Sequence, residues 1–264
     1  MDDWKEFRRS GGQREDPKLD ETTALYYYLH SIGVGDIGIS TFEPIDESQI
    51  NVLKRFRNVF DLAYRRYNDI ALAEAQAREA QIEAALERVR SRTMGMQKSE
   101  ELKEVIQVVY EQFVQLNIHI EHTGFIMDYK ARDDMNIWLA DKHEVPFQVT
   151  LPYFDCAHWN SFNEAKEKGT NFFANHLTFE EKNKFYQDLF KHIPGVPDKT
   201  KEYYFNCPGL AISTVLLEDV GLYIENFDGI PYTDEENNTL MRFGKVFRQT
   251  YTRFIDLKKA EAQA

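Results

Sequence analysis

The feature that most constrains this chain is an internal repeat of a helical segment. Residues 53–77 read LKRFRNVFDLAYRRYNDIALAEAQA and residues 240–264 read LMRFGKVFRQTYTRFIDLKKAEAQA, and 13 of these 25 aligned positions are identical. Similarity at such a long separation indicates an array of whole domains, because the units of solenoid proteins recur every ~20–50 residues. The repeated helix therefore ends one domain and leads into the next.

The position of the repeat predicts four segments. Residues 1–66 form the C-terminal part of a first domain, and residues 67–98 form a connecting helix. Residues 99–255 form a complete domain, and residues 256–264 begin a second connecting helix. Each copy follows a predicted β-hairpin and a capping box, Asp46 with Gln49 in the first and Thr233 with Glu236 in the second. The hairpins support this division independently of the identities.

The first connecting helix is predicted to be long, since no Gly or Pro occurs between Ile45 and Met94. Its apolar residues follow steps of three and four, which is a heptad pattern. The opposite face is charged, which favours a parallel coiled coil between two copies of the chain. The alternative is a helix that packs along its own domain. The predicted dimer seam contains Leu72, Ile82, Leu86, Val89 and Met96.

The complete domain is predicted to mix helices and strands. Capping signals and helical periodicity predict helices, and alternating or continuous apolar runs bounded by turns predict strands. The predicted helices cover residues 102–116, 158–168, 178–192 and 233 onward. The predicted strands cover residues 120–129, 136–141, 200–207, 210–217 and 222–227, with an extended segment at 145–155.

Composition and motifs exclude several function classes. A net charge of −12 and a pI near 5.1 argue against nucleic acid and against a basic membrane-binding patch. No apolar run reaches the ~18 residues of a membrane helix, and the amino terminus lacks a signal-peptide core, so we expect a cytoplasmic protein. Cys156 and Cys207 are the only cysteines and form no metal-binding spacing. No catalytic motif occurs, so we expect a non-enzyme with no catalytic or metal-ligating residue, and no cofactor is identified.

The order of these elements resembles the GAF domain family. The resemblance is carried by the closing strand LYIENF at 222–227, the acidic helix cap YTDEE at 232–236, and the apolar positions Leu240, Phe243 and Val246. The first copy repeats the pattern at Asp46, Leu53, Phe56 and Val59. The connector at 73–94 resembles linkers of bacterial multidomain sensor proteins, including two-component systems, where GAF-like modules precede a histidine kinase or nucleotide cyclase. The resemblance implies an α+β fold, with a central antiparallel sheet, helices on one side and a ligand pocket on the other.

Aromatic and polar residues gather in the irregular middle of the complete domain. Apolar cavities with a few polar groups are the usual small-molecule sites, and irregular backbone beside a sheet often carries them. An equal alternative is that these side chains only fill the core. Cys156 lies near His158, as in bilin-binding GAF domains, but an alanine intervenes, and a buried cysteine is usually a small apolar residue. The candidate ligand-binding residues are Trp138, Tyr153, His158, Trp159, Asn163 and His176.

These features lead to one preferred function and two alternatives. The preferred function is a non-catalytic sensory module that binds a small molecule and relays its state through a dimeric helix to an output domain of a longer parent chain. The first alternative is an enzyme built on a GAF-type scaffold, which resembles the cysteine-dependent free methionine sulfoxide reductases. The second is a dimerisation scaffold without a ligand.

Overall fold

A computed structural model describes residues 6, 10–12, 17–142 and 146–263. The chain divides into two compact units, Met1–Ala77 and Arg78–Ala264, called here the N-terminal and C-terminal units. Helix α3 (Glu47–Met94) contributes to both. The C-terminal unit thus begins within the predicted connecting helix, before the predicted start at residue 99. Residue 264 of the predicted second connector lies outside the described residues.

The N-terminal unit contains a short helix, a hairpin and the first part of α3. Helix α2 (Lys18–Glu21) precedes strands β1 (Tyr26–Ser31) and β2 (Asp36–Thr41), which pair antiparallel. The predicted capping box is present, because Asp46 Oδ1 accepts from the Gln49 amide at 2.8 Å and Gln49 Oε1 accepts from the Asp46 amide at 2.9 Å. These reciprocal bonds satisfy two backbone donors and fix where α3 begins. The predicted hairpin and helix start are confirmed.

The C-terminal unit is built on a six-stranded antiparallel sheet with the order β5-β4-β3-β8-β7-β6. The predicted hairpin between residues 210–217 and 222–227 is confirmed, because β7 and β8 pair directly. The fold is therefore α+β, as expected. The strands are β3 (His122–Met127), β4 (Met135–Ala140), β5 (Phe147–Leu151), β6 (Phe172–Leu177), β7 (Leu210–Leu217) and β8 (Val220–Asn226).

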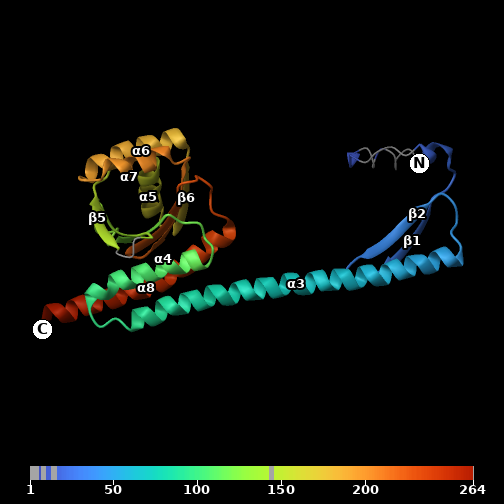
Figure 1. Cartoon of the computed structure of the whole chain (residues 1–264), viewed down its shortest axis with the longest axis horizontal. Coiled ribbons are helices and arrows are strands. Elements are labelled where there is room, and N and C mark those ends of the chain that lie inside the picture. The colour runs from blue at the N-terminus through green and yellow to red at the C-terminus, as the bar shows by residue number, and fades with distance from the viewer. Residues whose placement is uncertain (1–5, 7–9, 13–16, 143–145, 264) are drawn as a thin grey trace. The chain divides into compact units, whose positions relative to one another are not determined.

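Helices cover both faces of this sheet, which explains the continuous apolar runs of its central strands. One face is covered by the end of α3, by α4 (Leu102–Gln115) and by α8 (Asp234–Gln263). A short 3₁₀ helix, η1 (Ser99–Glu101), precedes α4. On the other lie α5 (Ala157–Lys168), α6 (Phe179–His192) and α7 (Asp198–Asn206). Figure 1 shows α4 and α8 beneath the sheet and α5–α7 above it. Neighbouring residues of β3 point to opposite faces, Phe125 toward α8 and Ile126 toward the second layer.

The last part of α3 runs parallel to α8 within one chain. Three contacts keep the same separation of 157 residues: Arg78 with Glu235, Thr93 with Thr250 at 2.6 Å, and Arg253 with the Met96 carbonyl. The heptad pattern therefore serves a parallel helix pair inside the C-terminal unit. A heptad seam specifies a partner helix but neither its direction nor the chain that supplies it.

This pairing corrects most of the predicted dimer seam. The side chains of Ile82, Leu86, Val89 and Met96 are at most 3% exposed and belong to the core of their own unit. The interface between chains predicted for these four residues is therefore wrong. Leu72, which precedes this unit, is 60% exposed, and its role stays a prediction.

Two local predictions also differ from the structure. The aromatic segment at 200–207, predicted as a strand, forms α7. Pro197 and Asp198 are a helix-start signal, and the helix places Thr200 and Tyr204 one turn apart on the same face. Strand β6 was not predicted. Its burial is intermediate and irregular because it is a sheet edge, so it lacks a clear alternating pattern.

Candidate functional site

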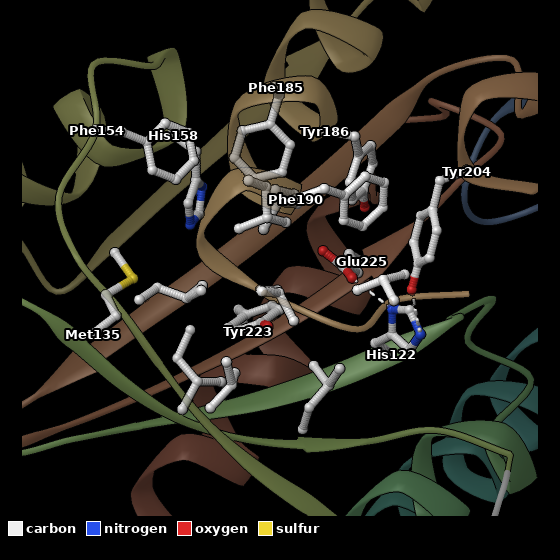
Figure 2. Close-up of a pocket in the computed structure, with 18 of the residues that line it drawn as sticks. His122, Met135, Phe154, His158, Phe185, Tyr186, Phe190, Tyr204, Tyr223 and Glu225 are labelled. Atoms are coloured by element: carbon white, nitrogen blue, oxygen red, sulfur yellow. Dashed lines mark hydrogen bonds and ion pairs between the residues drawn. The ribbon is translucent and has the colours of Figure 1, made fainter. Parts of the chain in front are cut away.

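A cavity of about 250 Å³ lies between the sheet and α6, on the face opposite α8. Its wall is mostly apolar, and its lining comes from β3, β4, β5, β7, β8 and the segments around α5, α6 and α7. In Figure 2, Phe185, Tyr186 and Phe190 of α6 face Tyr223 and Glu225 of the sheet. The apolar lining includes Met135, Ile137, Leu139, Phe147, Val149, Leu151, Phe185, Leu189, Phe190 and Ile193.

Strand β8 carries two polar side chains into this cavity. Tyr223 and Glu225 are two residues apart and therefore share one face of the strand, roughly 7 Å apart along it. Their neighbours Leu222 and Ile224 point into the opposite core. Across the ladder, Gly124 is opposite Tyr223 and His122 is opposite Glu225. The sheet register thus places a histidine beside a carboxylate at one end of the cavity.

A hydrogen-bonded chain occupies that end. The carboxylate of Glu225 only accepts, so the imidazole Nδ1 of His122 donates to Glu225 Oε1 over 2.7 Å. In the neutral imidazole Nε2 is then an acceptor, and the Tyr204 hydroxyl lies 3.5 Å from it. The His122 and Glu225 residues are both buried, at 8% exposure. These hydrogen bonds orient the side chains of Tyr204, His122 and Glu225 at the cavity surface.

His158 of α5 supplies a second polar group. Its Nδ1 lies 3.0 Å from Asn175 Oδ1 in β6, and the Asn175 amide donates to Ser161 Oγ at 2.8 Å. The amide oxygen can only accept, so Nδ1 of His158 carries the proton and Nε2 is an acceptor. Burial lowers the pKa of His158, against smaller opposing effects of Asn175 and Glu225. His158 therefore lines the cavity as a neutral imidazole at pH 7.

Two tyrosine hydroxyls complete the polar surface. Burial first, and the Glu225 carboxylate second, raise the pKa of Tyr186 and of Tyr223 well above the ordinary value. Both phenols stay protonated and can donate or accept. Within the part of the chain that the structure describes, neither hydroxyl has a hydrogen-bond partner. Neither oxygen is among the fully buried unsatisfied groups, so both hydroxyls are open to the cavity, where a bound polar group or water can reach them.

The structure brings together two of the six predicted ligand-binding residues, His158 and Trp159, which both line the cavity. Trp138 instead packs on the α8 side, because Ile137 and Leu139 take the cavity face of β4. The other three residues also lie outside the lining, so the prediction for these four is corrected. Tyr153 is half exposed and bonds Asn160, Asn163 is half-buried on α5, and His176 is exposed on β6.

The polar residues that the sheet and α7 contribute to the cavity are not among the residues predicted from the sequence. His122 lies more than 100 residues before Tyr223 and Glu225 and meets them only across one ladder, and Tyr204 belongs to a segment predicted as a strand. One signal was present in the closing strand LYIENF, where Tyr and Glu alternate with apolar residues inside a strand buried on both faces. Polar residues at such positions must find a buried partner.

Neither cysteine lines the cavity. Cys156 caps α5, where its Sγ accepts from the Trp159 amide at 3.4 Å, and Cys207 donates to the Tyr203 carbonyl after α7. Both are free thiols, and burial raises the pKa of each. Among the described residues no group of three or more His, Cys, Asp or Glu side chains is placed to hold a metal ion. No helix in the described ranges is long and apolar enough to cross a membrane.

The comparisons with known proteins give similarity in structure only. No family model and no curated protein matches the sequence. One similar structure is the GAF domain of a Coxiella burnetii phosphoenolpyruvate-protein phosphotransferase, with 8% identity over 70% of this chain and 98% of that chain, and a TM-score of 0.41. The GAF domain of an Acinetobacter phosphoenolpyruvate-protein phosphotransferase has 9% identity over 64% and 93%, with a TM-score of 0.38. A methyl-accepting chemotaxis protein, residues 122 to 287, has 13% identity over 66% and 98%, also with 0.38. The C-terminal unit has a central antiparallel sheet, with one helix layer on the face opposite the cavity. In this fold it is GAF-like.

Proposed function

We propose that this chain is a non-catalytic sensory module of a cytoplasmic signalling protein, and that it binds a small molecule in the cavity between the sheet and α6. The observation that carries the proposal is the buried polar surface inside an apolar cavity. Tyr186, Tyr223 and Glu225 are at least nine-tenths buried and line it. Side chains that only filled a core would be expected to be apolar at these three positions. The cavity is slightly smaller than the ~300–1,000 Å³ of drug-sized ligand sites, which suits a small ligand.

A route from the cavity to the helix pair supports a signalling role. Strand β8 holds Tyr223 and Glu225, and after residues 227–233 the chain enters α8. This connection is ordered by Asn226, which bonds Ile230 twice, and by Tyr232, whose hydroxyl donates to the His119 carbonyl at 3.0 Å. A ligand that moved β8 would therefore bias α8 and its parallel partner α3. A ligand shifts such an equilibrium only by its different affinity for the two arrangements.

The proposal retains a homodimer through α3 but assigns a different surface to it. Phe56 and Val59 are 65% and 68% exposed, whereas their repeat equivalents Phe243 and Val246 are buried in the C-terminal unit. Exposed apolar side chains grouped on one helix favour association. Light scattering should give a dimer for the unchanged chain, a monomer for Val59→Glu, and a dimer for the matched control Lys54→Glu. A monomer at all concentrations up to about 100 µM overturns the dimer without touching the cavity.

The enzyme alternative has less support. The free methionine sulfoxide reductases that it resembles depend on cysteines, and neither thiol of this chain lines the cavity. The scaffold alternative is tested by filling the cavity. The probe is the neutral apolar fluorophore N-phenyl-1-naphthylamine, whose emission rises in an apolar site. Val149→Trp on β5 should abolish that rise, and Gln148→Trp, the neighbour whose side chain is not in the lining, should retain it. Equal emission from both variants, or none from the unchanged chain, contradicts ligand binding in this cavity.

A further inference from the structure

The cavity contains hydrogen-bond acceptors without donors. Glu225 Oε1 accepts from His122, and no donor to Glu225 Oε2 lies among the described residues. His158 Nδ1 is used by Asn175, which leaves Nε2 as an acceptor, again with no donor in the described part of the chain. Both residues line the same cavity. Neither acceptor is fully buried, and both are open to the cavity, so a ligand that displaces water from this end must itself donate to them or leave them unsatisfied.

The charge of the cavity lining narrows the class of ligand that can bind. Of the described residues that line it, Glu225 is the only one with an acidic side chain, and none is Lys or Arg. The nearby buried Lys182 is already used, since its Nζ donates to the Tyr204 and Phe205 carbonyls at the end of α7. A carboxylate or phosphate ligand would thus meet the carboxylate of Glu225, with no Lys or Arg in the described lining to pair with it. A cationic or neutral donor would meet a partner already oriented by His122.

The shape of the polar surface fixes the orientation of such a ligand. Glu225 and its partners His122 and Tyr204 occupy one end, and the wall from β4, β5 and α6 is apolar. In Figure 2 the carboxylate of Glu225 points into the space between Tyr223, Phe190 and Tyr186. A charged and hydrogen-bonded group at one end, with a mostly apolar wall that also carries the acceptor of His158, matches an amphiphilic molecule. The hydroxyls of Tyr186 and Tyr223 can accept or donate a hydrogen bond, so they can pair with a ligand group of either kind.

We propose that the cavity takes a small apolar molecule that ends in a hydrogen-bond donor, above all a protonated amine, which binds the carboxylate of Glu225 while its apolar part contacts β4, β5 and α6. This inference rests on the proposed function, because it names the ligand class of the same cavity. It requires no covalent step and no cofactor.

The test compares three ligands of equal length, octylamine, octanol and octanoate, as competitors of N-phenyl-1-naphthylamine below their micelle-forming concentrations at pH 7. The expected order of affinity is octylamine, then octanol, then octanoate, with at least a tenfold difference between the first and the last. Glu225→Gln keeps an acceptor for His122 but removes the charge, and should bring the amine within threefold of the alcohol. The control Glu202→Gln removes an exposed carboxylate of α7 and should change nothing.

The outcomes separate the two proposals. Octanoate binding as tightly as octylamine, or a Glu225→Gln variant that keeps the full amine preference, overturns the donor class while binding in the cavity stands. Failure of the fluorophore to bind the unchanged chain removes the proposed function instead. Circular dichroism and a thermal melt of Glu225→Gln test whether the variant is folded. If it is not, Tyr204→Phe, which leaves Glu225 charged, must retain the amine preference for the inference to stand.

Discussion

The aromatic ring of Tyr223 occupies the space beside the Cα of Gly124 on the neighbouring strand. A Cβ at residue 124 would lie 2.0 Å from Cε1 of that ring. The two residues are opposite each other in the β3–β8 register, so the ring lies across β3 at the floor of the cavity. Glycine within a strand marks such a close approach. Gly124 therefore sets the position of a cavity hydroxyl.

Gly124→Ala should destabilise the C-terminal unit by about 1–3 kcal/mol, the usual cost of forcing extra atoms into a packed core. Urea unfolding measures the change. Removing the ring should relieve the collision, so Gly124→Ala combined with Tyr223→Ala should cost less than the sum of the two single changes. Strict additivity would show that the ring does not depend on Gly124.

Leu86→Glu tests whether the heptad seam belongs to one chain. The residue is 2% exposed and packs in the core beneath α8, so a carboxylate there would be buried without a partner. The C-terminal unit should lose about 3–5 kcal/mol and its thermal transition should fall or vanish. Leu72→Glu is the matched control, because this exposed residue should change stability by less than ~0.5 kcal/mol. A Leu86→Glu chain that melts normally but changes from dimer to monomer would restore the seam between chains.

Acid should weaken the fold through His158. Burial holds its pKa in the folded state below the ~6.5 of an unfolded chain. Above about pH 6.5 both states are neutral and the effect is absent. Below it the unfolded state binds a proton that the folded state refuses, so the free energy of unfolding falls as pH decreases, by at most ~1.4 kcal/mol per pH unit.

Urea titrations between about pH 7 and pH 5 measure that slope. His158→Gln should flatten it, since glutamine does not titrate, although other groups contribute a remainder. His176→Gln is the matched control, because this histidine is exposed on β6 and the same substitution there removes no buried imidazole. An identical slope in His158→Gln and the unchanged chain contradicts the assignment.

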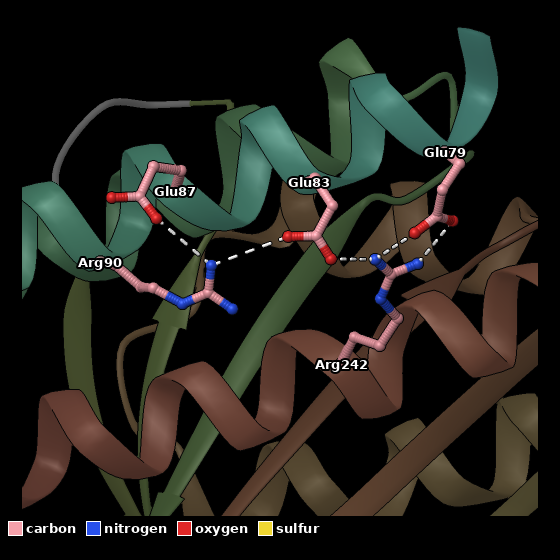
Figure 3. Close-up of polar contacts among 5 residues, drawn as sticks. All are labelled: Glu79, Glu83, Glu87, Arg90 and Arg242. Atoms are coloured by element: carbon pink, nitrogen blue, oxygen red, sulfur yellow. Dashed lines mark hydrogen bonds and ion pairs between the residues drawn. The ribbon is translucent and has the colours of Figure 1, made fainter. Parts of the chain in front are cut away.

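Ion pairs along α3 and α8 should add a small, salt-sensitive stabilisation. Arg242 of α8 bonds Glu79 and Glu83 of α3, and Arg90 pairs with Glu83 and Glu87 (Figure 3). Arg242→Gln should lower the melting temperature slightly at low salt, and the difference should disappear near 1 M salt, where the Debye length is about 3 Å. Arg55, the repeat equivalent of Arg242, has no ion pair among the described residues, so Arg55→Gln should have no salt-dependent effect.

Much of the secondary structure followed from local chemistry in the sequence. The capping boxes at Asp46 and Thr233 fixed two helix starts, because their partners lie three residues away. The uninterrupted run between Ile45 and Met94 predicted α3, and the apolar run at 210–217 predicted β7. The internal repeat also required two copies of a hairpin followed by a capped helix, and both copies are present.

The tertiary structure decided which partner each apolar or polar face meets. The heptad pattern of α3 required a partner helix, and only the folded unit showed that α8 of the same chain supplies it and runs parallel to α3. The candidate site depends in the same way on the sheet register, which joins His122 to Glu225 across 103 residues and turns Trp138 away from the cavity. Periodicity along a chain reports that a face is apolar or polar. It carries no information on the distant residue that packs there, because that contact is set by the pairing of strands and helices far apart in the sequence.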